Sequence, residues 1–273
     1  MDLTISIVNY NTRELLRQCL SSIYSASAPM EYRVCVVDNS SPDDSGKMVM
    51  EHFPSVHLIA NGSNVGFGKA HNQVIRATDS EFILLLNPDV IVEPGSIEAM
   101  VEFMQSHGDV GILGCKLFNS DMSLQFSCRR YPCAPTIFLR GLYADVIFPG
   151  VRAFSHYTMA DWDHASLAEV DWLIGSCMLI RRLALEDAGL FDENFFMYYE
   201  DVDLCIRMWR RWRVCYFPYV YMVHYHLKQS HKLMNVRQRF IHMRSACHFF
   251  RKHGLFPSRQ ARFQEDPMCQ SVA

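Results

Sequence analysis

Acidic and polar residues are grouped at three places in the chain, with types and spacing that could bind a metal ion or move a proton. The first group, Asn87-Pro88-Asp89, closes an apolar run and places one carboxylate directly after it. A hard divalent cation that is also held by substrate phosphates needs only one or two protein carboxylates. The same three residues are good turn formers, and taken alone the motif indicates a turn.

The second group, Glu200-Asp201-Val202-Asp203, has three carboxylates in four residues. At a helix N-terminus these acids would interact favourably with the helix dipole, which is a purely structural interpretation. Aromatic residues at 195–199 precede them, however, and burial against an aromatic wall would raise the pKa of Asp201 and make it a better general base. Local sequence supports the two interpretations about equally.

The third group is His224 with His226, at the end of an apolar run over residues 214–223. Positions i and i+2 of a strand share a face, so either ring could reach a metal ion or a phosphate. A histidine at a strand end is more often simply hydrogen-bonded. Gly66-Phe67-Gly68 begins like a phosphate loop, but His71 stands at the third glycine of G-x-G-x-x-G, so a dehydrogenase-type dinucleotide fold is weakly supported.

An alternation of strands and helices must position these groups. Strands are expected at residues 3–9, 32–37, 56–60 and 81–86, and helices at 12–24 and 68–78. This alternation is typical of an α/β fold with a mostly parallel, doubly wound sheet and helices on both faces. Ligands bind such sheets at the carboxyl ends of the strands, where Asn9–Asn11, Asp38–Ser41 and Asn87–Asp89 all lie. The sequence therefore predicts one polar edge that gathers these residues.

The second half of the chain is less regular. Residues 116–168 are expected to form a loop-rich segment with short helices, followed by strands at 171–180 and 214–223 and helices at 182–188 and 200–212. A basic amphipathic C-terminal helix is expected at 235–253. Its apolar face is predicted to contain Val236, Phe240, Met243, Cys247 and Phe250.

Composition narrows the class of protein without naming a function. With 273 residues, 49% of them hydrophobic and 20% charged, the chain suits one compact domain or two closely packed halves. No apolar run reaches the roughly 18–20 residues that span a bilayer, and the chain enters a strand at once without a signal peptide. The ten cysteines include no Cys-x-x-Cys pair, so reduced thiols and a cytoplasmic location are expected.

Charge is distributed unevenly along the chain. Residues 1–203 contain 13 Lys and Arg against 27 Asp and Glu, a balance of −14, whereas residues 204–273 contain 13 against 2, a balance of +11. No acidic residue lies between Asp203 and Glu265. This asymmetry indicates an anionic partner for the C-terminal part, whether nucleic acid, anionic lipid or a phosphorylated substrate.

Together and in this order, the motifs resemble the inverting family 2 glycosyltransferases of the GT-A fold. The resemblance is closest to the rhamnosyltransferase-like members that build bacterial surface polysaccharide. It covers about residues 3–226 and rests on Ser6–Asn11, Val37–Ser41, Asn64–Gly68, Leu86–Asp89, Trp172–Ser176, Gly189–Glu193, Glu200–Leu204 and His224. It implies a nucleotide-sugar-binding half at 1–115, an acceptor-binding and catalytic half at 116–228 and a basic tail at 229–273.

The resemblance also implies a role for each matching residue. The catalytic base would be Asp201, the metal ligands Asp89 and His224, and the cofactor Mg²⁺ or Mn²⁺. The nucleotide would be bound by Val8, Asn9, Asn11, Asp38, Asn64, Gly66, His71 and Asn87. The acceptor would be bound by Trp172, Gly175, Glu200 and Asp203. Because Asn87 replaces the first acid of the family's D-x-D motif, a single carboxylate remains and weak metal affinity is expected.

The implied reaction is a single displacement with inversion, from a nucleotide diphosphate sugar to a glycan or a polyprenyl-diphosphate-linked acceptor. The best-matching donor is dTDP-rhamnose, used in O-antigen or cell-wall synthesis, and the alternatives are UDP-hexose and UDP-galactofuranose. The tail could pack on the catalytic domain, bind anionic lipid as a peripheral protein at the cytoplasmic face of the inner membrane, or do both.

Other classes of protein fit less well. A sugar-nucleotide-forming nucleotidyltransferase needs a glycine-rich loop with a basic residue after the first strand, which Asn9-Tyr10-Asn11-Thr12 is not. A processive synthase needs membrane spans and a Gln-x-x-Arg-Trp motif, but Met208 holds the Gln position before Arg211-Trp212. A non-catalytic nucleotide-sugar binder stays open. No nucleic-acid partner is expected, because no nucleic-acid-binding module is recognisable.

Overall fold

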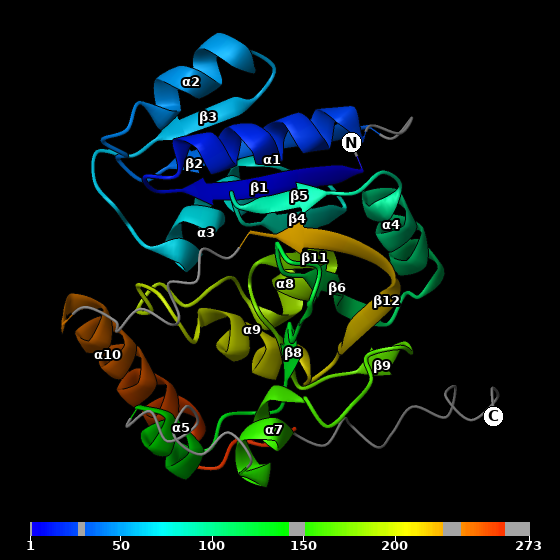
Figure 1. The fold of residues 1–273 in the computed structure, drawn as a ribbon, viewed down its shortest axis with the longest axis vertical. Helices are drawn as coiled ribbons and strands as arrows, with labels where there is room; N and C mark the ends of the chain where they lie inside the picture. Colours follow the sequence, from blue (N-terminus) through cyan, green and yellow to red (C-terminus); the bar gives the residue numbers. More distant parts are fainter. Residues whose placement is uncertain (1, 27–30, 142–150, 226–235, 260–273) are drawn as a thin grey trace.

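A 10-stranded sheet forms the centre of the molecule, in a computed structural model that describes residues 2–26, 31–141, 151–225 and 236–259 (Figure 1). Its strands are β1 (Leu3–Asn9), β2 (Tyr32–Asp38), β3 (His57–Ala60), β4 (Phe82–Leu86), β5 (Val90–Val92), β6 (Val110–Phe118), β7 (Leu124–Gln125), β9 (Ala168–Glu169), β11 (Cys177–Arg181) and β12 (Arg213–His224). Their order is β3-β2-β1-β4-β11-β6-β12-β5, with β7 on β6 and β9 on β12. A second, two-stranded sheet pairs β8 (Cys128–Arg129) with β10 (Trp172–Leu173).

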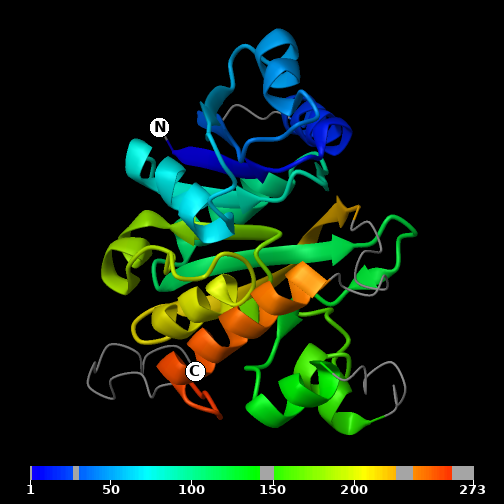
Figure 2. The ribbon, with the colours of Figure 1, turned by 90° about the vertical axis from the view of Figure 1, so that its left-hand side faces the viewer.

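Helices cover both faces of the large sheet, as the sequence predicts. They are α1 (Arg13–Ser25), α2 (Ser45–His52), α3 (Phe67–Ala77), α4 (Ser96–Ser106), α5 (Ala134–Gly141), α7 (Arg152–Thr158), α8 (Arg182–Ala188), α9 (Glu200–Met208) and α10 (Val236–His253). One buried cluster joins α1, α2 and α4 to one face, and another joins α8, α9 and α10 to the other. In Figure 2, α9 and α10 run side by side on their face of the sheet.

Strand β4 shows why the central strands are apolar at every position. Phe82, Leu84 and Leu86 face the cluster that contains α1 and α4, whereas Ile83 and Leu85 face the cluster that contains α8 and α9. Side chains alternate across a strand, so a strand between two helical layers must be hydrophobic on both sides. All five residues are buried.

Strand directions bring the polar ends together. β1 is parallel to β2 and to β4, with Asn9 opposite Asp38 and Ile7 opposite Leu86. Across the sheet, β5 pairs with the end of β12, with Val90 opposite His224. β11 runs antiparallel between β4 and β6, so the largely parallel sheet is mixed at its centre. The predicted polar edge is confirmed for these strands.

Some predicted elements need correction. The strand expected at 171–180 is two short strands, β10 and β11, because its first part pairs with β8 outside the main sheet and Gly175 lies in the turn between them. The helix expected at 200–212 ends at Met208. Thr12 precedes α1 as expected, but its hydroxyl donates to Asn9 Oδ1 at 2.6 Å and caps no helix amide.

The C-terminal helix is present, but its buried face is not the predicted one. Phe249 is fully buried against Tyr199, whereas Val236 is 84% exposed, Phe240 61% and Met243 58%. The helix is therefore rotated about its axis so that Ser245 and Phe249 face the core. The boundary expected between residues 115 and 116 falls inside β6, so the two halves share one sheet. Residues 229–235 and 260–273 of the tail lie outside the described residues.

Candidate active site

The carboxylate of Asp38 is held in a fixed orientation at the polar edge. Asn9 Nδ2 donates to Asp38 Oδ1 at 2.8 Å, and the Ser41 amide donates to Oδ2 at 3.0 Å. Asn9 is fully buried, so its side-chain amide orients the Asp38 carboxylate from the protein interior. Asn11 has a left-handed backbone, with φ 56°, and its amide donates to Ser41 Oγ at 2.9 Å. Val8 is half-buried beside them.

Gly66 connects the first half of the chain to the segment that leads into α9. Its φ is +92°, and a Cβ there would lie 2.3 Å from the carbonyl oxygen of Phe196, so only glycine fits. Asn64 Oδ1 accepts from the Gly66 amide at 3.0 Å, and the Phe67 amide donates to Phe196 O at 3.0 Å. The Gly66 loop therefore fixes the approach of the nucleotide side to the α9 side.

His71 lies behind this loop, inside the protein. It is fully buried, its Nδ1 is 2.8 Å from Ser6 Oγ, and its ring is 4.4 Å from that of Phe67. Burial lowers the pKa of His71 to about 3, so the ring is neutral. In this geometry His71 supports Phe67 from within, and we assign it no contact with a diphosphate.

Asp89 and His224 meet at the end of β12. His224 Nε2 lies 3.1 Å from Asp89 Oδ1, and both side chains are largely buried. Two ligands at right angles on Mg²⁺, each about 2.1 Å from the ion, would be about 3.0 Å apart, so the pair fits one divalent cation. Among the described residues no cluster of three His, Cys, Asp or Glu side chains could hold a metal, so donor phosphates would have to complete the shell. His226 lies outside the described residues.

Asp201 lies in the first turn of α9. Hydrogen bonds through Gly175-Ser176 connect it to the polar edge. Its Oδ2 accepts from the Gly175 amide at 3.1 Å and its Oδ1 from the Val202 amide at 2.8 Å. The next carbonyl, that of Ser176, accepts from the Asn87 amide at 2.9 Å. Burial raises the pKa of Asp201 to about 6, against the lowering effect of the two amides. The candidate base and Asn87-Pro88-Asp89 thus lie on either side of Gly175-Ser176.

The other two acids of α9 have different surroundings. Burial, and then the charge of Asp201, raises the pKa of Glu200 well above its ordinary value. Asp203 is fully buried and faces α10. It forms ion pairs with Arg207 at 2.9 Å and with Lys252 and His253 at 2.7 Å.

These partners explain the charge state of Asp203 and change its expected role. Burial alone would raise the pKa of Asp203, but the hydrogen bond from His253 and the charges of Arg207 and Lys252 lower it. A buried carboxylate that pairs with Arg207 and Lys252 and accepts from His253 anchors α10 to α9. In this geometry Asp203 has a structural role, and we assign it no contact with the acceptor.

An arginine that the sequence did not single out lies beside Trp172, near Asp201. Arg129 on β8 is opposite Trp172 on β10, and its guanidinium carbon is 6.0 Å from the Trp172 ring centre and 5.7 Å from that of Tyr157. Its positive charge lowers the pKa of Asp201. Gly175 packs closely against Phe67, because a Cβ at position 175 would lie only 3.1 Å from the Phe67 ring. No local motif marks Arg129, and only the pairing of two short strands reveals it.

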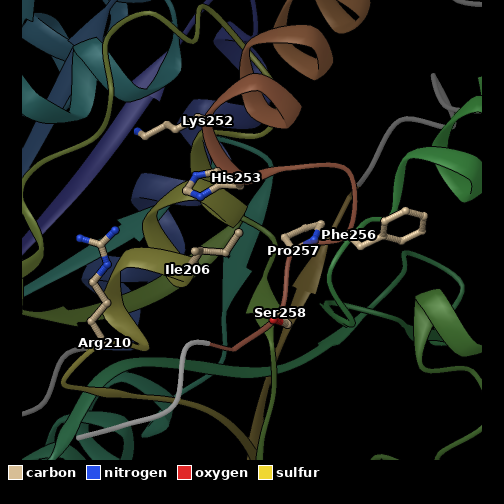
Figure 3. A pocket seen from close by; sticks show the side chains of 7 residues that line it. All are labelled: Ile206, Arg210, Lys252, His253, Phe256, Pro257 and Ser258. Carbon is tan, nitrogen blue, oxygen red and sulfur yellow. The ribbon is translucent and has the colours of Figure 1, made fainter.

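A separate pocket of about 240 Å³ lies at the far end of α9, where Figure 3 shows its lining side chains. Lys252 and His253 of this pocket both contact Asp203, whose carboxylate pairs with the charge of Lys252. Asp201 is at the opposite end of the helix. We therefore assign this pocket no part in the candidate active site.

Known proteins similar to this chain include two named rhamnosyltransferases. It is 31% identical over 82% of its length to N-acetylglucosaminyl-diphospho-decaprenol L-rhamnosyltransferase of Mycobacterium tuberculosis, with 76% of that protein covered. It is 24% identical over 93% of its length to rhamnosyltransferase WbbL of Escherichia coli, with 95% covered.

The fold is also shared with a solved mannosyltransferase. PcManGT from Pyrobaculum calidifontis, in complex with GDP-Man and Mn²⁺, superposes with a TM-score of 0.58 at 19% identity. The match covers 87% of this chain and 62% of that one, so the chain spans less than two thirds of its length. The fold is of the GT-A type. The family model for glycosyl transferase family 2 matches residues 4–189, more than half of the sequence, and the chain belongs to this family.

Proposed function

We propose that this glycosyltransferase transfers L-rhamnose from dTDP-rhamnose to a hydroxyl of a glycan or of a polyprenyl-diphosphate-linked sugar, in the synthesis of cell-surface polysaccharide such as O-antigen or cell wall. The names of the Mycobacterium tuberculosis and Escherichia coli relatives support the sugar, and the first also supports the acceptor. The GDP-Man complex of PcManGT indicates that this fold accepts several donors. UDP-hexose and UDP-galactofuranose are therefore the alternative donors.

Asp201 is the proposed catalytic base, and its environment is the observation that carries the mechanism. A partly buried carboxylate with a pKa of about 6 is ionised at neutral pH and is a stronger base than an ordinary aspartate. It would remove the proton of the acceptor hydroxyl as that oxygen attacks the anomeric carbon. The bond to the diphosphate breaks on the opposite side, so the reaction inverts the configuration.

Asp89 and His224 are the proposed ligands of Mg²⁺ or Mn²⁺, and Asn87 would hydrogen-bond the donor beside them. When bound, the cation would neutralise the charge that develops on the diphosphate leaving group. The 3.1 Å separation of the two ligand atoms and the Mn²⁺ in PcManGT support this assignment.

The donor is proposed to lie along the polar edge. Asp38 would accept from the pyrimidine base, with Val8 and Asn11 lining the pocket and Asn9 holding Asp38 in place. Asn64 and Gly66 would lie along the ribose and diphosphate. Gly175, Glu200 and Arg129 would shape the acceptor site, since each of them interacts with Asp201, and Trp172 would join them beside Arg129.

The C-terminal helix is proposed to bring the enzyme to anionic lipid at the cytoplasmic face of the membrane. None of the helices among the described residues has the length and apolar character needed to cross a bilayer. On α10, the exposed Val236, Phe240 and Met243 lie among arginines, which is the composition of a helix that binds at the lipid surface.

Direct assay of transfer tests the proposal. The protein would be incubated with Mn²⁺, a lipid-linked N-acetylglucosaminyl diphosphate acceptor and each candidate donor in turn. Transfer from dTDP-rhamnose, with an inverted anomeric configuration by NMR, is the expected result. Donor binding without transfer or hydrolysis under all conditions would instead identify a non-catalytic nucleotide-sugar binder.

A further inference from the structure

A chain of hydrogen bonds runs from the turn between β6 and β7 to His224. It begins at Asp121, an exposed acid whose ionised carboxylate can only accept hydrogen bonds. The Ser123 hydroxyl donates its single proton to Asp121 Oδ1. Ser123 Oγ must therefore accept from its other neighbour, and it lies 2.9 Å from the amide nitrogen of Asn119.

This first step fixes the orientation of two side-chain amides. Because Asn119 Nδ2 donates to Ser123, its Oδ1 points the other way and accepts from Gln125 Nε2 at 3.0 Å. The oxygen of Gln125 then faces His224, with Oε1 2.8 Å from Nδ1. An amide oxygen cannot donate, so His224 carries its proton on Nδ1.

The consequence appears on the other side of the ring. With the Nδ1 proton donated to Gln125, the ring directs Nε2 at Asp89 Oδ1, 3.1 Å away. At that separation the two atoms attract each other only through a proton on Nε2 or through a cation that both of them bind. In the opposite tautomer, Nε2 would donate to Asp89 and could no longer bind a metal ion. Its unprotonated Nδ1 would then repel Gln125 Oε1.

We infer that Gln125 is a positioning residue for the metal site, held in its orientation by Asn119, Ser123 and Asp121. It favours the His224 tautomer whose Nε2 can bind a cation and disfavours a direct hydrogen bond from His224 to Asp89. The inference rests on the metal ligands of the proposed function. Partners of this kind typically change metal affinity by about 10–100-fold.

Titration of the protein with Mn²⁺ in the presence of dTDP, followed by electron paramagnetic resonance of the unbound ion, tests this role. Gln125→Met removes the acceptor at similar size, and we expect Mn²⁺ affinity about tenfold below that of the unchanged protein. Gln125→Glu keeps an oxygen opposite Nδ1 and is expected to retain the affinity. Gln18→Met, an exposed glutamine on α1, is the matched control and should change nothing.

Two further measurements separate positioning from a loss of structure. Asp121→Ala removes the acceptor of the Ser123 hydroxyl, and we expect a smaller loss of Mn²⁺ affinity with an unchanged melting temperature. In metal-free protein labelled with ¹⁵N-histidine, long-range ¹H–¹⁵N spectra should show the Nδ1–H tautomer for His224. Gln125→Met should shift it toward the Nε2–H tautomer.

The outcomes distinguish this role from the metal site itself. If the unchanged protein binds Mn²⁺ and Gln125→Met binds it equally well, the positioning role is overturned and the metal site stands. Equal losses in Gln125→Met and Gln125→Glu would also overturn it. If the unchanged protein binds no Mn²⁺ with dTDP, the metal site and the inference fail together.

Discussion

Asp201 is an aspartate whose surroundings act on its pKa in opposite directions. Burial disfavours the charged form, whereas the amides of Gly175 and Val202 favour it, and the result is a pKa of about 6. The carboxylate is thus basic enough to accept a proton in the transition state and still ionised at neutral pH. This balance depends on single atoms around one side chain.

Replacing Asp201 with asparagine should abolish this function without disturbing the donor site. Asp201→Asn keeps the shape and an oxygen acceptor for the neighbouring amides but cannot take a proton. We expect transfer to slow by about 10²–10⁴-fold with unchanged dTDP affinity, measured by a radiolabelled transfer assay and by calorimetry. Asp187→Asn, at the ion pair with Arg211, is the control. Near-normal turnover in Asp201→Asn would show that another group is the base.

The same pKa predicts the pH dependence of the reaction. The base acts in its ionised form, so protonation below about pH 6 should remove it. We expect kcat/KM to fall about tenfold per pH unit below that value and to level off above it, in a plot measured from pH 5 to 8. A profile without an acidic limb in this range would contradict the assignment.

At the scale of elements, the Gly66 loop contacts Phe196, which is distant in the sequence and lies in the segment that leads into α9. Gly66→Ala places a Cβ 2.3 Å from the Phe196 carbonyl at a positive φ, which the loop cannot accommodate without moving. We expect about 1–3 kcal/mol loss of unfolding free energy and weaker dTDP binding, by urea denaturation and calorimetry.

Gly62 offers a matched control in the same connection. A Cβ at Gly62 would meet no atom within 4 Å, so Gly62→Ala should leave stability and dTDP binding unchanged. If Gly66→Ala were as well tolerated as Gly62→Ala, the loop would not be a rigid connection between the nucleotide side and α9.

Asp203 has a comparable role between α9 and α10. Asp203→Asn would leave the charges of Arg207 and Lys252, and the ring of His253, without their buried carboxylate. Removing one partner of a buried ion pair typically costs about 3–5 kcal/mol, and we expect a loss of that order in unfolding free energy. Glu14→Gln, at an exposed pair with Arg17, is the control and should leave the unfolding free energy nearly unchanged, because solvent screens the pair. Equal effects would show that Asp203 does not anchor α10.

At the scale of the whole molecule, the anchored α10 presents its remaining apolar residues outward. Phe240→Ser with Met243→Ser removes exposed side chains only, so the fold should be kept. We expect roughly tenfold weaker binding to vesicles that contain phosphatidylglycerol, measured by flotation, because less apolar surface enters the lipid. Met50→Ser, an exposed methionine on α2, is the control. Unchanged flotation in the double variant would remove α10 from the proposed lipid contact.

The sequence by itself determined the order of the elements and the place of most candidate residues. Strand and helix periods are local, so β1, β4, α8 and β12 are recognisable from residues within each segment. The motifs that follow those strands predict the polar edge, because parallel strands end at the same side. Asp38 and Asp89 lie at or just after strand ends in this way, whereas Asp201 was singled out by its cluster of acids and by the family resemblance.

Only the tertiary structure decided which distant side chains meet. The ion pair of Asp203 with His253 spans 50 residues and the contact of Gln125 with His224 spans 99, and neither leaves a local pattern. The buried face of α10 was mispredicted for the same reason, since several of its faces contain apolar residues and packing against Tyr199 selects one. Local periodicity predicts which face of a helix or strand a side chain lies on. The neighbours that pack against that face determine the partner, the burial and hence the charge of the side chain.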